Sequence, residues 1–245
     1  MLGITLAGCS APEGAHTPQA PQLGTASLDP GVKDMTVLVV GDSLARAFGS
    51  GMSEVVSDRN VTVVNAAIGG CGIMLPSQQM VNNVLTDATE CNQWPTEWPA
   101  LLEQYQPDVV YLTTAFWDAA KQMIDDSGEP KNFEDAAFRL RYAQNVDQVL
   151  SILTSTGATV YMDNMAHDTN YEAQVDAVTR NADAGLTVKL IDVYGQMCVS
   201  TGDCPWLING IKVLDETGHP AGESRDRLAR FILNQMKAGL TEGSK

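Results

Sequence analysis

Short apolar runs alternate with longer amphipathic segments along most of the chain. The run at 35–40 is apolar throughout, which is typical of a strand buried on both faces of a sheet. Runs rich in β-branched residues predict strands over 35–40, 61–64, 109–112, 159–162 and 188–191. Apolar residues at three- and four-residue spacing and helix-forming composition predict helices over 45–56, 97–104, 133–153, 173–181 and 222–237.

This alternation predicts the fold class. Strands that alternate with helices form an α/β domain, in which helices cover both faces of a parallel sheet, here with five strands. The length of 245 residues fits one such domain rather than two, and we assign the domain to residues 34–240. Ligands of open parallel sheets bind beyond the carboxyl ends of the strands, so functional residues are expected in the loops that follow strands.

The charge balance excludes two classes of partner. The formal net charge is −15, with 15 basic against 30 acidic residues. Nucleic acids are held mainly by Lys and Arg that displace counterions, and anionic lipid surfaces attract basic faces, so neither is an expected partner. No apolar run approaches the roughly 18 residues of a membrane-spanning helix.

The first residues point to export. Leu6-Ala7-Gly8-Cys9 resembles the lipobox of bacterial lipoproteins, in which the cysteine is lipidated. We therefore interpret 1–9 as a truncated signal segment with Cys9 as the lipidation site, and 10–33 as a flexible tether rich in Pro, Ala, Gly, Ser and Thr. The alternative is a chance match in a disordered leader. An exported protein, anchored in the cell envelope through lipid or secreted, is the expectation.

Four further cysteines remain, Cys71, Cys91, Cys198 and Cys204. In an exported protein an even number favours disulfides, and the economical pairing is 71–91 with 198–204, although four cysteines allow three pairings. A zinc site is a weaker alternative because no C-x-x-C array is present. A catalytic thiol at Cys71 is weaker than a disulfide there.

A candidate nucleophile follows the first predicted strand. Gly41-Asp42-Ser43-Leu44 runs directly into a helix, so Ser43 stands where free backbone N–H groups stabilise negative charge. That position suits an alcohol whose attack on a carbonyl generates an oxyanion. The alternative is a serine that only caps the helix.

A candidate base lies near the other end of the chain. A serine nucleophile needs a neighbouring base, most often imidazole, and the chain has three histidines. His219 alone has acids placed to orient its ring, Asp215 and Glu216. His16 lies in the tether, and we expect a structural or substrate-rim role for His167.

These residues resemble the SGNH (GDSL) hydrolases, esterases and lipases with a three-layer flavodoxin-like fold. Gly41-Asp42-Ser43-Leu44 is similar to the family's first block. In the second block an asparagine precedes an oxyanion-hole glycine by five residues, which implies Gly70 from Asn65, with the Ser43 amide as its companion. The fifth block places an acid three residues before the histidine, which implies Glu216, whereas residue type favours Asp215. Both stay candidates.

The third block departs from the family pattern. Trp117-Asp118 stands where the family has an asparagine that donates to the oxyanion. A Trp-Asp pair at this place resembles the one in SGNH domains associated with membrane O-acyltransferases of envelope polysaccharides. The resemblance implies substrate contacts for Asp42, Trp117 and Asp118. Aromatic faces stack on sugars, so the tryptophans are either cleft or core residues: Trp94, Trp98, Trp117 and Trp206.

The resulting hypothesis is an exported serine esterase that hydrolyses O-acyl, in particular O-acetyl, esters on envelope carbohydrates or glycolipids. Ser43, His219 and Asp215 or Glu216 form the triad, and we expect no cofactor, no metal and a monomer. The alternatives are an O-acyltransferase with the same acyl-serine, a weakly catalytic carbohydrate-binding module, and an ordinary α/β-hydrolase based on Gly41-x-Ser43-x-Ala45.

Overall fold

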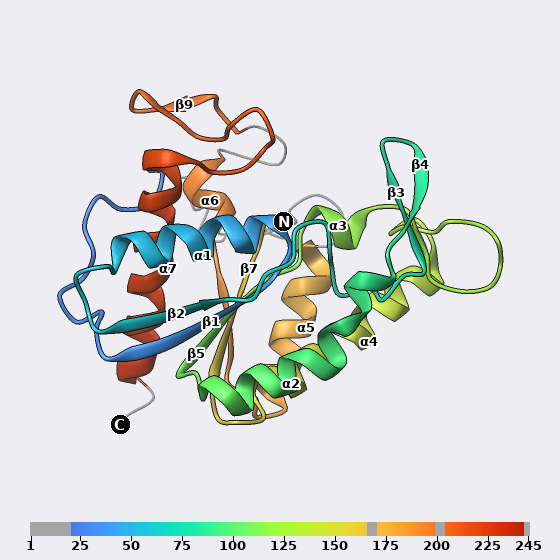
Figure 1. The fold of residues 1–245 in the computed structure, drawn as a ribbon, viewed down its shortest axis with the longest axis horizontal. Coiled ribbons are helices and arrows are strands. Elements are labelled where there is room, and N and C mark those ends of the chain that lie inside the picture. Colours follow the sequence, from blue (N-terminus) through green and yellow to red (C-terminus); the bar gives the residue numbers. More distant parts are fainter. Residues whose placement is uncertain (1–20, 166–170, 199–203, 243–245) are drawn as a thin grey trace, which may run out of the picture.

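A single parallel sheet organises the domain. The computed structural model describes residues 21–165, 171–198 and 204–242. The five strands run parallel in the order β2-β1-β5-β7-β8 (Figure 1). Each ends within one residue of its prediction: β1 (Met35–Gly41), β2 (Val61–Asn65), β5 (Val109–Thr113), β7 (Thr159–Asp163) and β8 (Val188–Ile191). The predicted α/β class with a parallel five-stranded sheet is confirmed.

Alternate residues of β1 face two separate apolar cores. Val37 and Val39 belong to the core under α1 (Ser43–Val55) and α7 (Gly222–Glu242), whereas Leu38 and Val40 belong to the core on the opposite face. Burial on both faces explains why the strand is apolar throughout. Figure 1 shows α1 and α7 together on one side of the sheet.

Three helices cover the opposite face: α2 (Trp94–Tyr105), α4 (Ala136–Leu153) and α5 (Tyr171–Asp183). α4 begins three residues later than the predicted start at residue 133. Its start is set by Asp135, whose carboxylate accepts hydrogen bonds from the backbone N–H groups of Ala137 and Phe138. The side-chain cap satisfies donors that the first turn leaves free, and it fixes the first helical residue.

Short elements fill the connections between the main strands. The sequence pattern did not predict them, because two to five residues are too few to display a period. One small sheet has the order β4-β3-β6, and a second pairs β10 with β9. Their bounds are β3 (Gln78–Val81), β4 (Val84–Asp87), η1 (Thr89–Gln93), α3 (Phe116–Ala119), β6 (Gln122–Met123), α6 (Tyr194–Met197), β9 (Leu207–Ile208) and β10 (Ile211–Lys212).

Residues 21–33 are part of the folded domain, which corrects their assignment to a flexible tether. Leu23 and Val32 are fully buried in the core beside α7. The Leu23 N–H donates to Gln196 O at 2.7 Å, and the Asp29 N–H donates to Asn234 Oδ1 at 2.8 Å. Composition alone concealed this packing, because two apolar residues spaced along a loop produce no periodic pattern. Cys9, His16 and the rest of residues 1–20 lie outside the described residues, as does His167.

Both favoured disulfides are present. Cys71 bonds to Cys91, and Cys198 bonds to Cys204. The first joins the loop after β2 to η1, which leads into α2. Within the part of the chain that the structure describes, none of the helices combines the length and apolar character needed to cross a membrane.

Candidate functional site

The turn between β1 and α1 carries Ser43 at the carboxyl edge of the sheet. Gly41 has φ +124°, and a Cβ there would collide with the carbonyl oxygen of Thr113 in the neighbouring strand, so only glycine fits. Asp42 caps α1, with Oδ1 accepting from the Leu44 N–H at 2.8 Å. Ser43 is therefore the first residue of the helix, where the N–H groups of the first turn have no helical acceptor.

The chain brings Ser43 and His219 together across 176 residues of sequence. Ser43 Oγ lies 2.7 Å from His219 Nε2, within hydrogen-bonding distance. Both residues line a cavity of about 420 Å³ that also includes Asp42, Leu44, Phe116, Trp117, Thr217 and Gly218. An alcohol and an imidazole in contact on the wall of a cavity are the groups that nucleophilic catalysis requires.

The turn that carries His219 is organised by Asp215. Its Oδ1 accepts from the Thr217 N–H at 2.8 Å, from Thr217 Oγ1 at 2.6 Å and from the His219 N–H at 3.1 Å. These bonds, with the Thr217 hydroxyl the largest cause, lower the pKa of Asp215 to about 2. The carboxylate is thus ionised at neutral pH. Thr217 Oγ1 also lies 2.9 Å from His219 Nδ1.

Glu216 points away from the histidine. Its Oε1 forms an ion pair with Lys212, and its side chain is largely exposed. The hydrogen bond from Lys212 lowers the pKa of Glu216. Of the two acids near His219, Asp215 has the contacts with the histidine turn and Glu216 has none among the described hydrogen bonds.

The loop after β2 brings Gly70 toward the turn at Ser43. The Ala66 N–H donates to Val39 O and the Ile68 N–H donates to Gly41 O, both at 2.9 Å. The Cys71 N–H then donates to Ile68 O at 3.2 Å, so Gly70 lies in a turn just beyond the end of this pairing. Gly70 has φ +86°, and its carbonyl oxygen accepts from Gln79 Nε2 at 2.8 Å. No acceptor for its N–H is found among the described residues, and no hydrogen bond there joins it to Ser43.

The loop that follows Gly70 is held from several directions at Ile73. The Ile73 N–H donates to Asp118 Oδ1 at 2.6 Å, and its carbonyl oxygen accepts from Asn145 Nδ2 at 2.7 Å and from Trp94 Nε1 at 3.3 Å. Asp118 itself is fully buried. Asp118 thus contacts the loop at Ile73 and is not among the residues that line the cavity with Ser43, and its substrate contact stays a prediction.

Trp117 and Asp42 lie beside Ser43 in different ways. Trp117 lines the cavity and packs edge-to-face on Phe116, whose side chain is 67% exposed. Asp42 also lines the cavity, but it is only 1% exposed and its carboxyl caps α1; its substrate contact stays a prediction. Asn65 donates from Nδ2 to Arg46 O at 2.9 Å, tying the end of β2 to α1.

Three buried carboxyl groups lie beneath the Ser43 turn. Burial raises the pKa of Asp42 to about 7, that of Asp118 to about 8 and that of Asp163 to about 6. Asp163 Oδ2 accepts from Tyr111 Oη at 2.5 Å and from Thr113 Oγ1 at 2.7 Å. The negative charge of Asp163 also raises the pKa of Asp42.

Sequence reasoning missed Asp163 and Thr217. Asp163 ends β7 at the carboxyl edge of the sheet, and that position was a usable signal. Thr217 stands two residues from both Asp215 and His219, a spacing that a turn can close but that carries no motif by itself.

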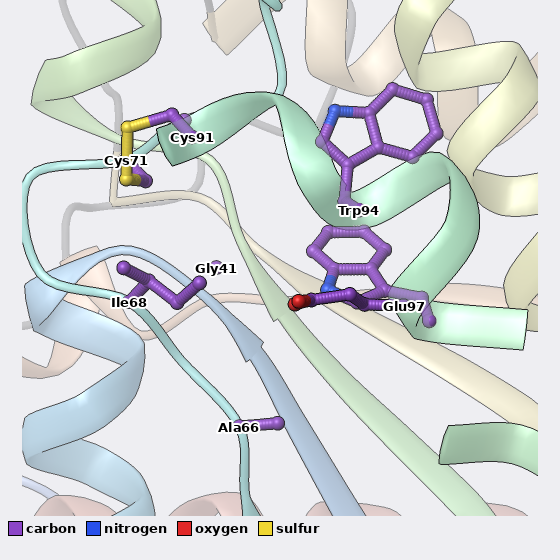
Figure 2. Close-up of a pocket in the computed structure, with 9 residues that line it drawn as sticks. Gly41, Ala66, Ile68, Cys71, Cys91, Trp94 and Glu97 are labelled. Atoms are coloured by element: carbon purple, nitrogen blue, oxygen red, sulfur yellow. A yellow bond between two sulfur atoms is a disulfide. The ribbon is translucent and has the colours of Figure 1, made fainter. Parts of the chain in front are cut away.

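A second, smaller cavity lies on the other side of Gly41. It is lined by Gly41, Ala66, Ile68, Cys71, Gly72, Cys91, Trp94, Glu97 and Trp98. Its volume of about 20 Å³ is close to that of one water, and neither Ser43 nor His219 reaches it. Figure 2 shows the Cys71–Cys91 bond at one end and Trp94 and Glu97 at the other.

The other tryptophans lie away from Ser43. Trp94 and Trp98 are core residues, 3% and 6% exposed, as the alternative interpretation expected. Trp206 is 61% exposed, with Lys212 Nζ 4.4 Å from its ring centre. Among the described residues no group of three His, Cys, Asp or Glu side chains is arranged to hold a metal ion.

Comparisons with known proteins show the family and the fold. The sequence profile described as "SGNH domain (fused to AT3 domains)" matches residues 8–163. No curated protein matches the chain by sequence. Solved structures resemble it at low identity, which shows the fold.

The following three solved structures each have a TM-score above 0.5. The lipopolysaccharide acetyltransferase periplasmic domain of Salmonella ser. Paratyphi A has 13% identity and TM-score 0.51, over 83% of this chain and 84% of that one. A carbohydrate esterase family 3 protein from Talaromyces cellulolyticus has 11% identity and TM-score 0.53, over 85% and 99%. The acetyl xylan esterase Est2A from Butyrivibrio proteoclasticus has 10% identity and TM-score 0.51, over 85% and 64%.

Proposed function

Because the chain belongs to the SGNH domains described as fused to AT3 domains, we propose that it is a serine esterase acting on O-acyl esters. The observation that carries the proposal is the 2.7 Å contact between Ser43 Oγ and His219 Nε2 on the wall of a cavity. Two groups far apart in sequence meet at the edge of the sheet where ligands of such folds bind.

The proposed reaction passes through an acyl-serine. Ser43 Oγ attacks the ester carbonyl carbon, its proton moves to His219 Nε2, and the carbonyl electron pair moves onto oxygen. The tetrahedral intermediate then collapses and expels the alcohol, which takes the proton from His219. Water attacks the acyl-serine, His219 accepts a proton from it, and Ser43 leaves with that proton as the carboxylic acid is released.

Backbone donors stabilise the oxyanion in this scheme. The Ser43 N–H lies at the positive end of α1, and we assign the second donor to the Gly70 N–H, for which no acceptor is found among the described residues. The asparagine donor of the family's third block is absent: Trp117 occupies that position, and an indole N–H has a different reach and direction. Loss of one oxyanion donor typically costs about 3–4 kcal/mol of transition-state stabilisation. A slow enzyme is therefore expected.

The substrate class we propose is an O-acylated, in particular O-acetylated, carbohydrate or glycolipid outside the cytoplasm. Phe116 and Trp117 provide aromatic surface at the cavity on which a sugar ring can stack. Among the described residues, neither lysine nor arginine lines the cavity, which suits an uncharged ligand. The two disulfides support an extracytoplasmic site, and the structural neighbours are named as an acetyltransferase periplasmic domain and carbohydrate esterases.

The decisive experiment compares Ser43→Ala with wild type in hydrolysis of p-nitrophenyl acetate and in labelling by a fluorophosphonate probe. We expect Ser43→Ala to lose both, because no other serine lines the cavity among the described residues. Ser50→Ala is the matched control, since Ser50 lies on the same helix and its hydroxyl bonds only to Arg46 O in the described part of the chain. Unchanged turnover in Ser43→Ala would refute the mechanism, and an unlabelled wild type would favour a binding module.

Acyl transfer to a sugar hydroxyl is the second candidate function. The family's description names fusion to AT3 domains, and one structural neighbour is an acetyltransferase domain. The same acyl-serine serves both reactions, because an acceptor hydroxyl replaces water in the second half. Product analysis with an acylated donor and a free oligosaccharide acceptor separates them: transfer yields an acylated acceptor, whereas hydrolysis yields only free acid.

A further inference from the structure

We propose that Thr217 is a positioning residue whose hydroxyl links the Asp215 carboxylate to His219 Nδ1. This link selects the His219 tautomer that can accept the proton of Ser43. The proposal rests on the esterase function proposed above and assigns the connection between acid and base. Thr217 Oγ1 lies 2.6 Å from Asp215 Oδ1 and 2.9 Å from His219 Nδ1, so one hydroxyl oxygen contacts both groups.

The direction of each hydrogen bond follows from the inventory of protons. An ionised carboxylate only accepts, so the Thr217 O–H donates to Asp215. A hydroxyl has one proton, so toward His219 the Thr217 oxygen can only accept, and Nδ1 must carry the hydrogen. In a neutral imidazole with a proton on Nδ1, Nε2 has a free lone pair. Ser43 Oγ, 2.7 Å away, then donates its proton to Nε2.

The alternative acids do not reach the ring. Glu216 is occupied by Lys212, and Asp215 contacts His219 through the backbone N–H of that residue at 3.1 Å. The described hydrogen bonds of the His219 ring are therefore those to Ser43 and Thr217. The Asp215 carboxylate is connected to the imidazole through the Thr217 hydroxyl. In this respect the site differs from a triad in which the carboxylate contacts the imidazole directly.

The arrangement has an energetic consequence. When His219 takes the serine proton, its new positive charge faces a hydroxyl oxygen and the carboxylate stands one bond further away. Coulombic attraction falls with distance, so the imidazolium receives less stabilisation than from direct contact. The hydroxyl still fixes the tautomer and the plane of the ring, which is the positioning role.

The test compares three variants in kcat and KM for p-nitrophenyl acetate. Thr217→Val removes the hydroxyl at similar volume, and we expect kcat to fall roughly 10- to 100-fold with KM within about 3-fold. Thr217→Ser keeps the hydroxyl and should retain kcat within about 3-fold. Thr154→Val is the control, since Thr154 lies at the opposite edge of the sheet, where its hydroxyl bonds to Leu150 O.

A double-mutant cycle with Asp215→Asn tests whether the two residues act as one unit. Asparagine keeps an oxygen for the backbone N–H groups of Thr217 and His219 but removes the charge. If Thr217 transmits the effect of Asp215, the double variant falls little below the poorer single variant. Independent roles would instead multiply the two losses and overturn the linkage.

The tautomer of the His219 imidazole can be measured directly, and a nonspecific loss of structure would not shift it toward the other tautomer. The chain has three histidines, so the ¹⁵N resonances of His219 can be assigned with a His219→Asn variant. We expect the neutral ring to carry its proton on Nδ1 in wild type and Thr217→Ser, and a shift toward Nε2–H in Thr217→Val. Wild-type kcat and tautomer in Thr217→Val, or an equal loss in Thr217→Ser, would overturn the proposal. Retained activity in Ser43→Ala would instead refute the esterase function.

Discussion

Two turns meet at the Ser43–His219 contact, and the structure holds them in different ways. On the serine side, the loop at Ile73 that follows Gly70 is fixed by partners far away in sequence, Asp118 and Asn145. The His219 turn is fixed by hydrogen bonds that Asp215 makes within four residues. The carboxyl groups differ in the same sense: those beneath Ser43 are buried with raised pKa, whereas the partly exposed Asp215 has a lowered one.

The difference teaches where activity and stability are coupled. A change in the His219 turn disturbs a local network at the surface, so it should affect catalysis with little effect on folding. A change on the serine side, by which we mean the Ser43 turn and the loop from Gly70 to Ile73, removes contacts between elements of the core. Such a change should affect both catalysis and folding stability. Each prediction below tests this division, beginning with the largest expected effect.

Replacing the base should produce the largest loss of activity with the smallest loss of stability. In His219→Ala the Ser43 hydroxyl has no acceptor for its proton, and we expect kcat to fall about 10³-fold or more. The free energy of unfolding should change by less than about 1 kcal/mol, because the ring bonds only to Ser43 and Thr217 among the described side chains. Esterase assays and urea titration measure the two quantities. A large loss of stability would show that the histidine turn is not an independent local unit.

Removal of the Cys71–Cys91 disulfide tests the serine side, and removal of the Cys198–Cys204 disulfide is the comparison. Loop-closure entropy predicts that Cys71→Ala/Cys91→Ala lowers the free energy of unfolding by about 3 kcal/mol, and that Cys198→Ala/Cys204→Ala lowers it by about 2 kcal/mol, since the second loop is shorter. Cys71 adjoins Gly70, so the first pair should also reduce kcat, whereas the second should not.

Urea titration and p-nitrophenyl acetate turnover, each below the unfolding transition, check both double variants. Equal kcat in the two would mean that the Cys71–Cys91 bond does not help to position Gly70, and the coupling of stability with activity on that side would fail.

The fold and the serine side were accessible from sequence because their signals are local. Five apolar runs predicted the strands, and the Gly41–Leu44 motif at the end of the first run predicted a serine at a helix start. His219 could be paired with it because imidazole is scarce in this chain. The 21–33 segment was missed, since its packing on α7 depends on single apolar residues such as Leu23 meeting a distant helix.

Which of the two acids, Asp215 or Glu216, contacts the His219 turn could not be predicted from the sequence. Spacing favoured Glu216 and residue type favoured Asp215, and the sequence holds no signal for which side chain the turn directs inward. That choice depends on the ion pair of Glu216 with Lys212 and on the bonds that close the turn around Asp215. The buried position of Asp118 likewise follows from the packing of the loop at Ile73, which no single segment encodes.

Stability should fall as the pH rises above about 4, because of the buried carboxyl groups. The pKa of Asp118 is raised to about 8 in the folded protein from an ordinary value of 3.8, so between these values the folded state keeps a proton that the unfolded state releases. Asp42 and Asp163 act in the same direction up to about pH 7 and 6. Asp215 acts oppositely, and its contribution is lost as the pH falls toward 2.

Asp118→Asn should flatten this pH dependence, because asparagine keeps the acceptor for the Ile73 N–H and has no proton to lose. Thermal melts at pH 5, 7 and 9 measure it, with the exposed Asp126→Asn as the control. A slope equal to that of wild type would mean that Asp118 is ionised when buried, which contradicts the raised pKa.

The smallest expected effect is at Glu216. Glu216→Gln breaks an exposed ion pair with Lys212, an interaction worth about 0–1 kcal/mol at a protein surface, and it leaves the contacts of Asp215 intact. We expect kcat and KM within about 2-fold of wild type. Asp215→Asn, one residue away, should reduce kcat much more, because the charge behind Thr217 is then removed. If Glu216→Gln were the more damaging of the two, the acid of this site would be the one that the family's spacing favours, and the turn would have to rearrange when substrate binds.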